Sequence, residues 1–199
     1  MPPEPGRPEL LRTPRLAVRR FTVDDLDDVA ALLGDRRVMR YLDDGWPVPR
    51  EVVAGATLPM ILREYELLPP GLGCWAVCER DGGAFAGWVA LRPANSRGLT
   101  GGTELGYRMR VGVWGRGYAA EAASALVAAA FDGRFGGPDV DRVVATTMTV
   151  NRASRRVMER IGLRYVRTFF EYWPDPIEGS EHGDVEYALT RAEWESLPI

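Results

Sequence analysis

The spacing of hydrophobic residues predicts a series of strands and helices along the chain. Short runs in which apolar and polar residues alternate favour strands, and longer segments with apolar residues at every third or fourth position favour helices. Strands are expected at 16–21, 74–79, 84–92, 103–111, 142–150, 163–173 and 184–189, and helices at 23–33, 49–68, 118–131 and 151–162. This order predicts an α/β protein with a mixed sheet, in which only the central crossovers must be parallel.

Local signals mark several boundaries of these elements. Thr22 followed by Asp25 forms a capping box at the start of the first helix, and Gly34 is a stop signal at its end. Pro59 is a potential interruption of the second helix. The residues 81–83, Asp-Gly-Gly, predict a hairpin between the second and third strands.

Composition predicts one folded domain. The chain has 199 residues, 46% of them hydrophobic and 27% charged, which is sufficient for one substantial core. We expect residues 1–8, which are rich in proline, to be a poorly ordered lead-in and residues 9–199 to form a single domain. The formal net charge of -3 argues against direct binding to nucleic acid. No apolar run approaches ~18 residues, so we expect a cytoplasmic protein without a membrane span.

The number and spacing of cysteine and histidine residues argue against a disulfide or a metal site. Cys74 and Cys78 lie four residues apart on an expected strand, which would separate them by roughly 13 Å and prevent them from pairing. We expect both to be buried thiols. His182 is the only histidine, so no metal site is predicted.

A glycine-rich segment joins the fourth expected strand to the following helix. Gly112, Gly115 and Gly117 leave backbone N–H groups near a helix N-terminus with little side-chain obstruction, which is typical of an anion site. The spacing differs from the dinucleotide fingerprint and lacks the Lys-Ser/Thr pair of a nucleotide-triphosphate loop. By itself, the glycine pattern leaves an ordinary flexible turn equally open.

The segment 114–122, Trp-Gly-Arg-Gly-Tyr-Ala-Ala-Glu-Ala, resembles the acetyl-CoA signature of the GNAT N-acetyltransferases. The resemblance is strongest to the branch that acetylates the N-termini of ribosomal proteins. Trp114 stands where the general pattern has Gln or Arg, a departure that is familiar in this branch. Three further stretches fit the same branch in the same order, at 11–16, 103–107 and 151–163. The resemblance spans roughly residues 11–190.

The resemblance implies a GNAT fold and an acetyl-CoA site. The fold is a mixed, mostly antiparallel central sheet flanked by about four helices, with a splayed parallel pair at the fourth and fifth strands. The pyrophosphate would contact amides of residues 114–119, and pantetheine would follow the strand edge at 109–111. The residues expected to bind the cofactor are Met109, Arg110, Val111, Trp114, Gly115, Arg116, Gly117, Tyr118, Ala119, Asn151 and Arg156. Asn151 is equally well explained as a helix N-cap, and Arg156 as part of a solvated basic face.

The family chemistry implied is direct attack by an amine on the thioester. Glu104 matches the position of the general base, acting through water, and its alternative role is a solvated strand carboxylate. Ser154 matches the position of the proton donor to the leaving thiolate. Its alternative role is a first-turn helix residue, although helical spacing places it on the same face as Met158 and Ile161.

Aromatic residues in loops are candidates for the acceptor groove, although such residues often only cover core edges. They are Tyr41, Trp46, Tyr172 and Trp173. The expected acceptor is a primary amine, either a protein N-terminus or a small molecule. A non-catalytic acyl-CoA sensor is the alternative function, and the sequence leaves a homodimer open.

Overall fold

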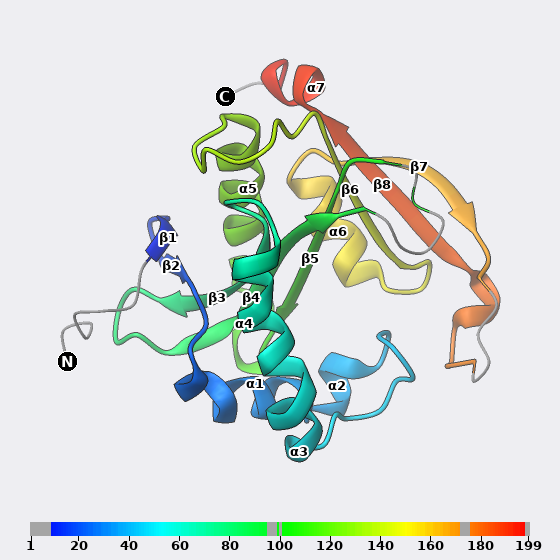
Figure 1. Cartoon of the computed structure of the whole chain (residues 1–199). Coiled ribbons are helices and arrows are strands. Elements are labelled where there is room, and N and C mark those ends of the chain that lie inside the picture. Colours follow the sequence, from blue (N-terminus) through cyan, green and yellow to red (C-terminus); the bar gives the residue numbers. More distant parts are fainter. Residues whose placement is uncertain (1–8, 95–98, 100, 172–175, 198–199) are drawn as a thin grey trace.

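The protein is described by a computed structural model that covers residues 9–94, 99, 101–171 and 176–197. A central sheet of eight strands runs through the molecule in the order β1-β2-β3-β4-β5-β6-β8-β7 (Figure 1). The strands are β1 (Glu9–Arg12), β2 (Leu16–Arg19), β3 (Gly73–Glu79), β4 (Phe85–Pro93), β5 (Thr103–Met109), β6 (Arg142–Met148), β7 (Arg164–Phe169) and β8 (Asp184–Thr190). The expected mixed and mostly antiparallel sheet, flanked by helices, is confirmed.

The parallel pair in the middle of the sheet is splayed. β5 and β6 form the parallel ladder, and its register contains only Thr103 opposite Val143 and Glu104 opposite Val144. Both strands continue beyond these pairs, to Met109 and Met148, without further pairing to each other. The edge of β5 that faces β6 is therefore open beyond Glu104.

Helices cover both faces of the sheet. One apolar cluster packs α5 (Tyr118–Phe131) and α6 (Arg152–Arg160) against one face, and a second packs α1 (Leu26–Leu33), α2 (Arg36–Met39) and α4 (Leu58–Leu67) against the other (Figure 1). α5 has alanines on the sheet side that are almost inaccessible to solvent, including Ala122 and Ala123. Small side chains allow this helix to approach the sheet closely.

The helical segment that follows α2 contains a π-turn immediately before its proline. α3 (Arg50–Val52) continues into a π-helix (Val53–Thr57) and then into α4. Pro59 is the second residue of α4, so its missing N–H falls next to the wider turn, and the chain stays helical. The predicted helix at 49–68 is confirmed, and Pro59 does not end it.

Several expected boundaries were wrong. β5 ends at Met109, and Val111–Val113 form a 3-10 turn, so Val111 does not extend the strand as its alternation predicted. β6 ends at Met148 and β7 at Phe169, short of the expected 150 and 173. Short elements that alternation does not detect are β1, α2 and α7 (Arg191–Glu195). Cys74 and Cys78 are buried free thiols, as expected.

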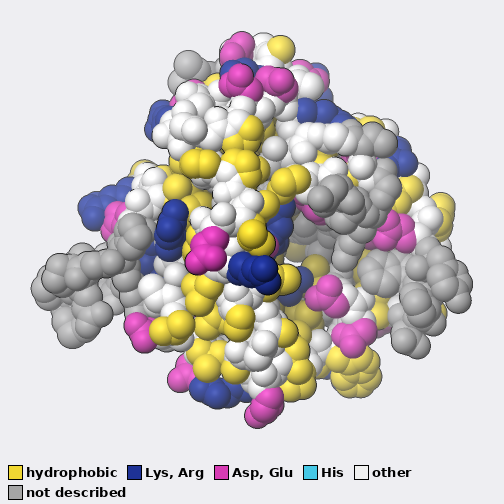
Figure 2. Space-filling view, in the orientation of Figure 1, with side chains coloured by type: hydrophobic (Ala, Val, Ile, Leu, Met, Phe, Trp, Pro, Cys, Tyr) yellow, Lys and Arg dark blue, Asp and Glu magenta, His cyan; other side chains and the backbone are white. Residues whose placement is uncertain are grey.

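Charges of both signs are interspersed on the face seen in Figure 2. The expected lead-in at 1–8 lies outside the described residues. Within the described part of the chain, no helix has the length and hydrophobicity needed to cross a membrane.

Candidate functional site

The open edge of β5 presents backbone groups to the gap beside β6. The amide of Arg110 donates to the carbonyl of Ala86 on the opposite side, at 2.9 Å. Because hydrogen-bonding direction alternates along an antiparallel pair, the amides and carbonyls of Leu105, Tyr107 and Met109 point toward β6. An extended ligand could pair with such an edge as an added strand would.

The glycine-rich turn lies at the end of this edge and precedes α5. Gly115 and Gly117 have φ angles of +76° and +80°, which favour glycine. A Cβ at Gly112 or Gly115 would meet no atom within 4 Å, so the space over them is open. The amides of Trp114 and Arg116 donate to carbonyls within the turn. The first-turn amides of a helix such as α5 lack intrahelical acceptors, so they are available to an anion at this turn.

The large side chains of the turn are held by neighbouring groups. The Trp114 indole N–H donates to the Met109 carbonyl at 2.8 Å. Arg116 forms an ion pair with Glu79 at 2.6 Å and stacks over Tyr118, with 4.6 Å from the guanidinium carbon to the ring centroid. The Tyr118 hydroxyl also donates to Glu79, at 3.0 Å. In this structure, Arg116 therefore lies against a carboxylate and an aromatic ring.

The loop between β1 and β2 contacts the first turn of α5. The Glu121 carboxylate accepts hydrogen bonds from the Thr13 hydroxyl at 2.6 Å, the Arg15 amide at 3.1 Å and Arg15 Nε at 2.6 Å. Arg15 also donates to the Arg116 carbonyl at 2.9 Å. The stretch at 11–16, which carries part of the family resemblance, therefore contacts both the glycine-rich turn and the first turn of α5.

Glu104 is the last β5 residue in the parallel ladder, and its side chain lies on the face covered by α4. It is in register with Arg92 of β4, and Arg92 forms an ion pair with Glu64 of α4 at 2.7 Å. The alternation of β5 therefore places Glu104 on the opposite face from Tyr107, as the sequence predicted.

Arg108 lies on the same face as Glu104, four residues further along β5. Its guanidinium lies 5.1 Å from the ring centroid of Trp88 and forms an ion pair with Asp43 at 3.3 Å. Burial lowers the pKa of Arg108, and the neighbouring Asp43 opposes that change. Asp43 has a φ of +50°, an unusual value for a residue other than glycine.

Ser154 lies in the first turn of α6, on the other side of the sheet from Glu104. The Tyr107 hydroxyl is 2.9 Å from both the carbonyl oxygen and Oγ of Ser154. Asn151 Oδ1 accepts the Ser154 amide at 3.2 Å, and its Nδ2 donates to Thr147 at 3.0 Å. The N-cap interpretation of Asn151 is therefore confirmed.

The arginines near the start of α6 do not all point the same way. Arg155 turns inward and donates to the Tyr187 hydroxyl and the Thr149 carbonyl, each at 3.1 Å. Arg152 and Arg156 are exposed and one helical turn apart, so Arg156 remains accessible to an anion.

The structure describes two of the four aromatic residues expected at the acceptor groove. Trp46 is 57% exposed, with Arg36 stacked 4.2 Å from its ring centroid, and Tyr41 is half-buried with Arg40 stacked at 5.0 Å. Tyr172 and Trp173 lie outside the described residues. Arg40 forms an ion pair with Glu178 at 3.4 Å, which links the loop after α2 to the chain before β8.

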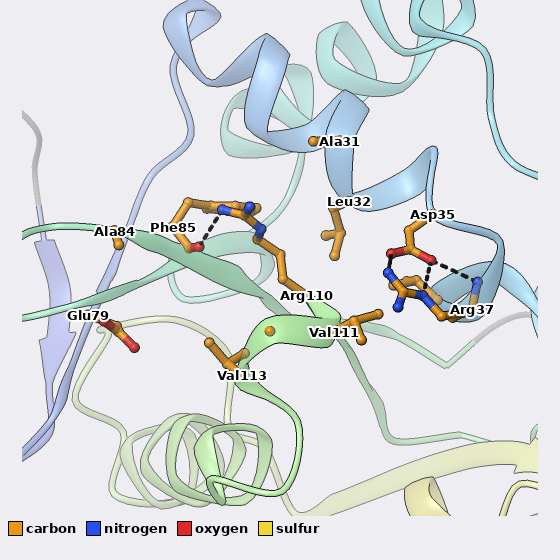
Figure 3. Close-up of a pocket in the computed structure, with 12 residues that line it drawn as sticks. Ala31, Leu32, Asp35, Arg37, Glu79, Ala84, Phe85, Arg110, Val111 and Val113 are labelled. Atoms are coloured by element: carbon orange, nitrogen blue, oxygen red, sulfur yellow. Dashed lines mark hydrogen bonds and ion pairs between the residues drawn. The ribbon is translucent and has the colours of Figure 1, made fainter.

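A cavity of about 350 Å³ lies between α1, α2 and the 3-10 turn after β5. Figure 3 shows Arg110 reaching from that turn toward Phe85, whose carbonyl oxygen it meets at 3.3 Å. Asp35 and Arg37 pair with each other on the opposite wall, at 2.6 Å. The side chain of Arg110 therefore faces this cavity, and its amide is bonded to β4, away from the open edge of β5.

Comparison with known families identifies the family to which this arrangement belongs. A model of the acetyltransferase (GNAT) domain matches residues 15–164, which include the open strand edge, the glycine-rich turn and the start of α6. The chain belongs to the GNAT acetyltransferase family. GNAT acetyltransferases use acetyl-CoA.

Individual relatives are also named as acetyltransferases. The FsC-acetyl coenzyme A-N(2)-transacetylase of Aspergillus fumigatus is 41% identical over 130 residues, which cover 63% of this chain. The match covers 53% of the relative, so this GNAT chain spans about half of its length. An acetyltransferase structure from Agrobacterium tumefaciens superimposes with a TM-score of 0.68 at 26% identity, covering 92% of this chain and 95% of that one.

A similar fold occurs in the branch suggested by the sequence. A ribosomal L7/L12 alpha-N-protein acetyltransferase in complex with coenzyme A has a TM-score of 0.71, covering 92% of this chain and 98% of that one. Its identity of 17% shows a common fold and does not assign the branch. Among the described residues, no group of three or more His, Cys, Asp or Glu side chains is arranged to hold a metal ion.

Two parts of the site were missed by sequence reasoning. Alternation along 103–111 places Arg108 on the same face as Glu104, but nothing in the sequence pairs it with Asp43. The same alternation points Tyr107 toward the helix that carries Ser154, 47 residues away in the chain. A polar side chain at an inward-facing strand position is the signal that could have marked Arg108 and Tyr107 as candidates, although it does not name their partners.

Proposed function

We propose that this protein is an acetyl-CoA-dependent N-acetyltransferase in which a primary amine attacks the acetyl thioester directly. The observation that carries this proposal is the position of two side chains around the splayed strands. Glu104 lies at the point where β5 and β6 separate, on the face covered by α4. Ser154 lies on the opposite face, in contact with Tyr107 of the open edge.

The residues of the open edge and the turn fit the cofactor. Leu105 and Tyr107 offer backbone groups and Met109 offers its amide to an extended pantetheine arm. In the segment 114–119, the amides that are not bonded within the turn are offered to a pyrophosphate. The exposed guanidinium of Arg156 supports a contact with a further phosphate. When bound, acetyl-CoA supplies an activated acetyl group.

The roles proposed for the two side chains follow from the proton balance of the reaction. An amine that forms an amide must lose a proton, and the Glu104 carboxylate accepts it through a water molecule. The sulfur that leaves the acetyl group gains a proton, and the Ser154 hydroxyl donates toward it. Solvent then restores the proton of Ser154.

The acceptor is proposed to be an amine that enters from the Glu104 side. Tyr41, Trp46, Asp43 and Arg108 line this side. Tyr172 and Trp173 stay predictions, because they lie outside the described residues. The name of the A. fumigatus relative specifies acetyl transfer from acetyl coenzyme A to a nitrogen, which supports the same reaction class. A protein N-terminus and a small-molecule amine remain the two acceptor classes to be tested.

The experiment measures thiol release from acetyl-CoA across a panel of N-terminal peptides and small amines, with mass identification of the product. With a verified acceptor, Glu104→Gln and Ser154→Ala are each expected to lower kcat by about 10²-fold or more, because each removes a proton-transfer group. Both variants should keep the affinity for coenzyme A.

Two results would contradict the proposal. Wild-type rates in both variants would show that the residue roles are wrong. If no amine accelerates thiol release although coenzyme A binds, the protein is instead a non-catalytic acyl-CoA sensor.

A further inference from the structure

The hydroxyl of Tyr107 contacts two oxygen atoms of one residue. It lies 2.9 Å from the carbonyl oxygen of Ser154 and 2.9 Å from Ser154 Oγ. The rest of the Tyr107 side chain packs against the apolar cluster beneath α5 and α6. Tyr107 belongs to the stretch at 103–107 that carries part of the family resemblance, and the proposed reaction gives its side chain no role.

The single proton of a phenol can serve only one of these oxygens at a time. If Tyr107 donates to the Ser154 carbonyl, its contact with Oγ requires the serine O–H to donate back to the phenol oxygen. The serine proton then points at Tyr107. If Tyr107 donates to Oγ instead, the serine proton is released to point elsewhere.

Both arrangements leave the surrounding groups bonded. The carbonyl of residue 154 lies inside α6, where it accepts the amide of residue 158, so it keeps a partner when Tyr107 turns away. Burial raises the pKa of the Tyr107 hydroxyl, and the hydrogen bond with Ser154 only partly opposes this. The phenol therefore stays neutral and keeps its proton at physiological pH.

We propose that Tyr107 is a positioning residue that sets the direction of the Ser154 hydroxyl proton. Donation to the carbonyl keeps the serine proton directed at the Tyr107 oxygen, and donation to Oγ leaves that proton free to point at the departing sulfur. The inference rests on the proposed donor role of Ser154. No proton leaves Tyr107 in this scheme, because only its O–H bond direction changes.

The test begins with Tyr107→Phe, which removes the hydroxyl and keeps the ring. With a verified amine acceptor, we expect kcat to fall about five- to tenfold, the effect of losing one orienting hydrogen bond, while KM for acetyl-CoA stays the same. Ser154→Ala is expected to lower kcat further. The double variant should be no slower than Ser154→Ala alone, since Tyr107 acts only through Ser154.

A second measurement needs neither cofactor nor activity. In the cofactor-free protein, the urea midpoints of the two single variants and the double variant report the coupling between the hydroxyls. Because the two groups are in direct contact, we expect the double variant to shift the midpoint by less than the sum of the single shifts. A purely additive result would contradict the hydrogen bond itself.

Tyr165→Phe is a matched control. The Tyr165 hydroxyl also pairs with a side-chain hydroxyl, Thr168 Oγ1 at 2.9 Å, but on the exposed strand β7. We expect this variant to keep the wild-type kcat.

The outcomes separate this inference from the proposed function. If Ser154→Ala is slow and Tyr107→Phe has the wild-type kcat, the positioning role is wrong and the proposed function stands. If the kcat losses of the two variants multiply in the double variant, Tyr107 acts independently of Ser154 and the inference is also wrong. If Ser154→Ala is as fast as the wild type, the proposed role of Ser154 fails first.

Discussion

Gly115 and Gly117 give the turn before α5 a backbone that other residues adopt only with strain. Both have positive φ, whereas Gly112 at the start of the same turn does not. All three glycines were recognised from the sequence, but only the structure distinguishes those that require glycine from the one that does not. The spacing of glycines in the sequence shows where side chains are absent, but it does not indicate which of these residues have a positive φ.

Gly115→Ala is expected to destabilise the protein by about 1 kcal/mol, because its Cβ has space but its backbone does not favour alanine. Gly112→Ala is the matched control, since it also has open space and lacks the positive φ. Its effect should stay within about 0.5 kcal/mol. Urea unfolding of the two variants compares them, and equal stabilities would contradict this explanation of the turn.

The residues proposed for catalysis were partly predictable from alternation. Period-two alternation correctly places Glu104 and Tyr107 on opposite faces of β5. It could not predict that Tyr107 meets Ser154, because that contact depends on how α6 packs against the sheet. Arg116 illustrates the same limit, since its partner Glu79 lies 37 residues earlier in the chain.

The loop between β1 and β2 forms hydrogen bonds with the first turn of α5. Thr13 and Arg15 donate three hydrogen bonds to Glu121, whose side chain is only 16% exposed. Arg15 also holds the carbonyl of Arg116, inside the turn. These bonds fix the start of the helix in the position from which its amides face the proposed cofactor.

Glu121→Ala is therefore expected to weaken coenzyme A binding as well as folding. Loss of bonds to a partly buried carboxylate should cost about 2 kcal/mol of stability. The amides at the start of α5 would be less firmly positioned, which should raise the Kd for coenzyme A roughly fivefold, corresponding to about 1 kcal/mol. Calorimetry measures the Kd, with Asp27→Ala as control, because that exposed carboxylate also pairs with an arginine. An unchanged Kd for Glu121→Ala would show that the contact is only structural.

The same carboxylate predicts a pH dependence. Burial of Glu121 opposes its ionisation, but hydrogen bonds from Thr13 and Arg15 outweigh burial and lower its pKa below the usual 4.5. A group whose pKa is depressed by folding stabilises the protein above its unfolded value, and this contribution is lost as the pH falls. Between about pH 5 and about pH 3, Glu121→Gln should lose less stability than the wild type. The measurement is the free energy of unfolding of both proteins as a function of pH. If both lose the same stability between these pH values, the depressed pKa of Glu121 is contradicted.

Long elements were predicted better than short ones. The helix at 118–131 matches α5, a run of fourteen residues that is rich in alanine, which favours helices strongly. β1, α2 and α7 span four, four and five residues, too few for periodicity to be recognised. The splay of β5 and β6 was predicted from the family resemblance. Alternation within a strand does not indicate which strand it pairs with.

In the whole molecule, one sheet separates two apolar clusters. Side chains from alternate positions of β3 and β4 enter both clusters, so neither cluster is complete without these strands. Trp75 belongs to one and Trp88 to the other. This shared sheet supports the proposal that residues 9–199 form a single domain.

We therefore expect a single cooperative unfolding transition. Far-UV circular dichroism and tryptophan fluorescence should give coincident urea curves, because both clusters lose the same sheet. Two separated transitions would contradict the single-domain proposal.

The central claim is that the gap between β5 and β6 holds the cofactor. The most direct test is to measure amide hydrogen exchange with and without coenzyme A. The account predicts slower exchange for amides of Leu105, Tyr107 and Met109 and for those of residues 115–119, with little change in β1 and β2. Unchanged exchange in these segments, with protection instead around the cavity lined by Asp35 and Arg37, would contradict it.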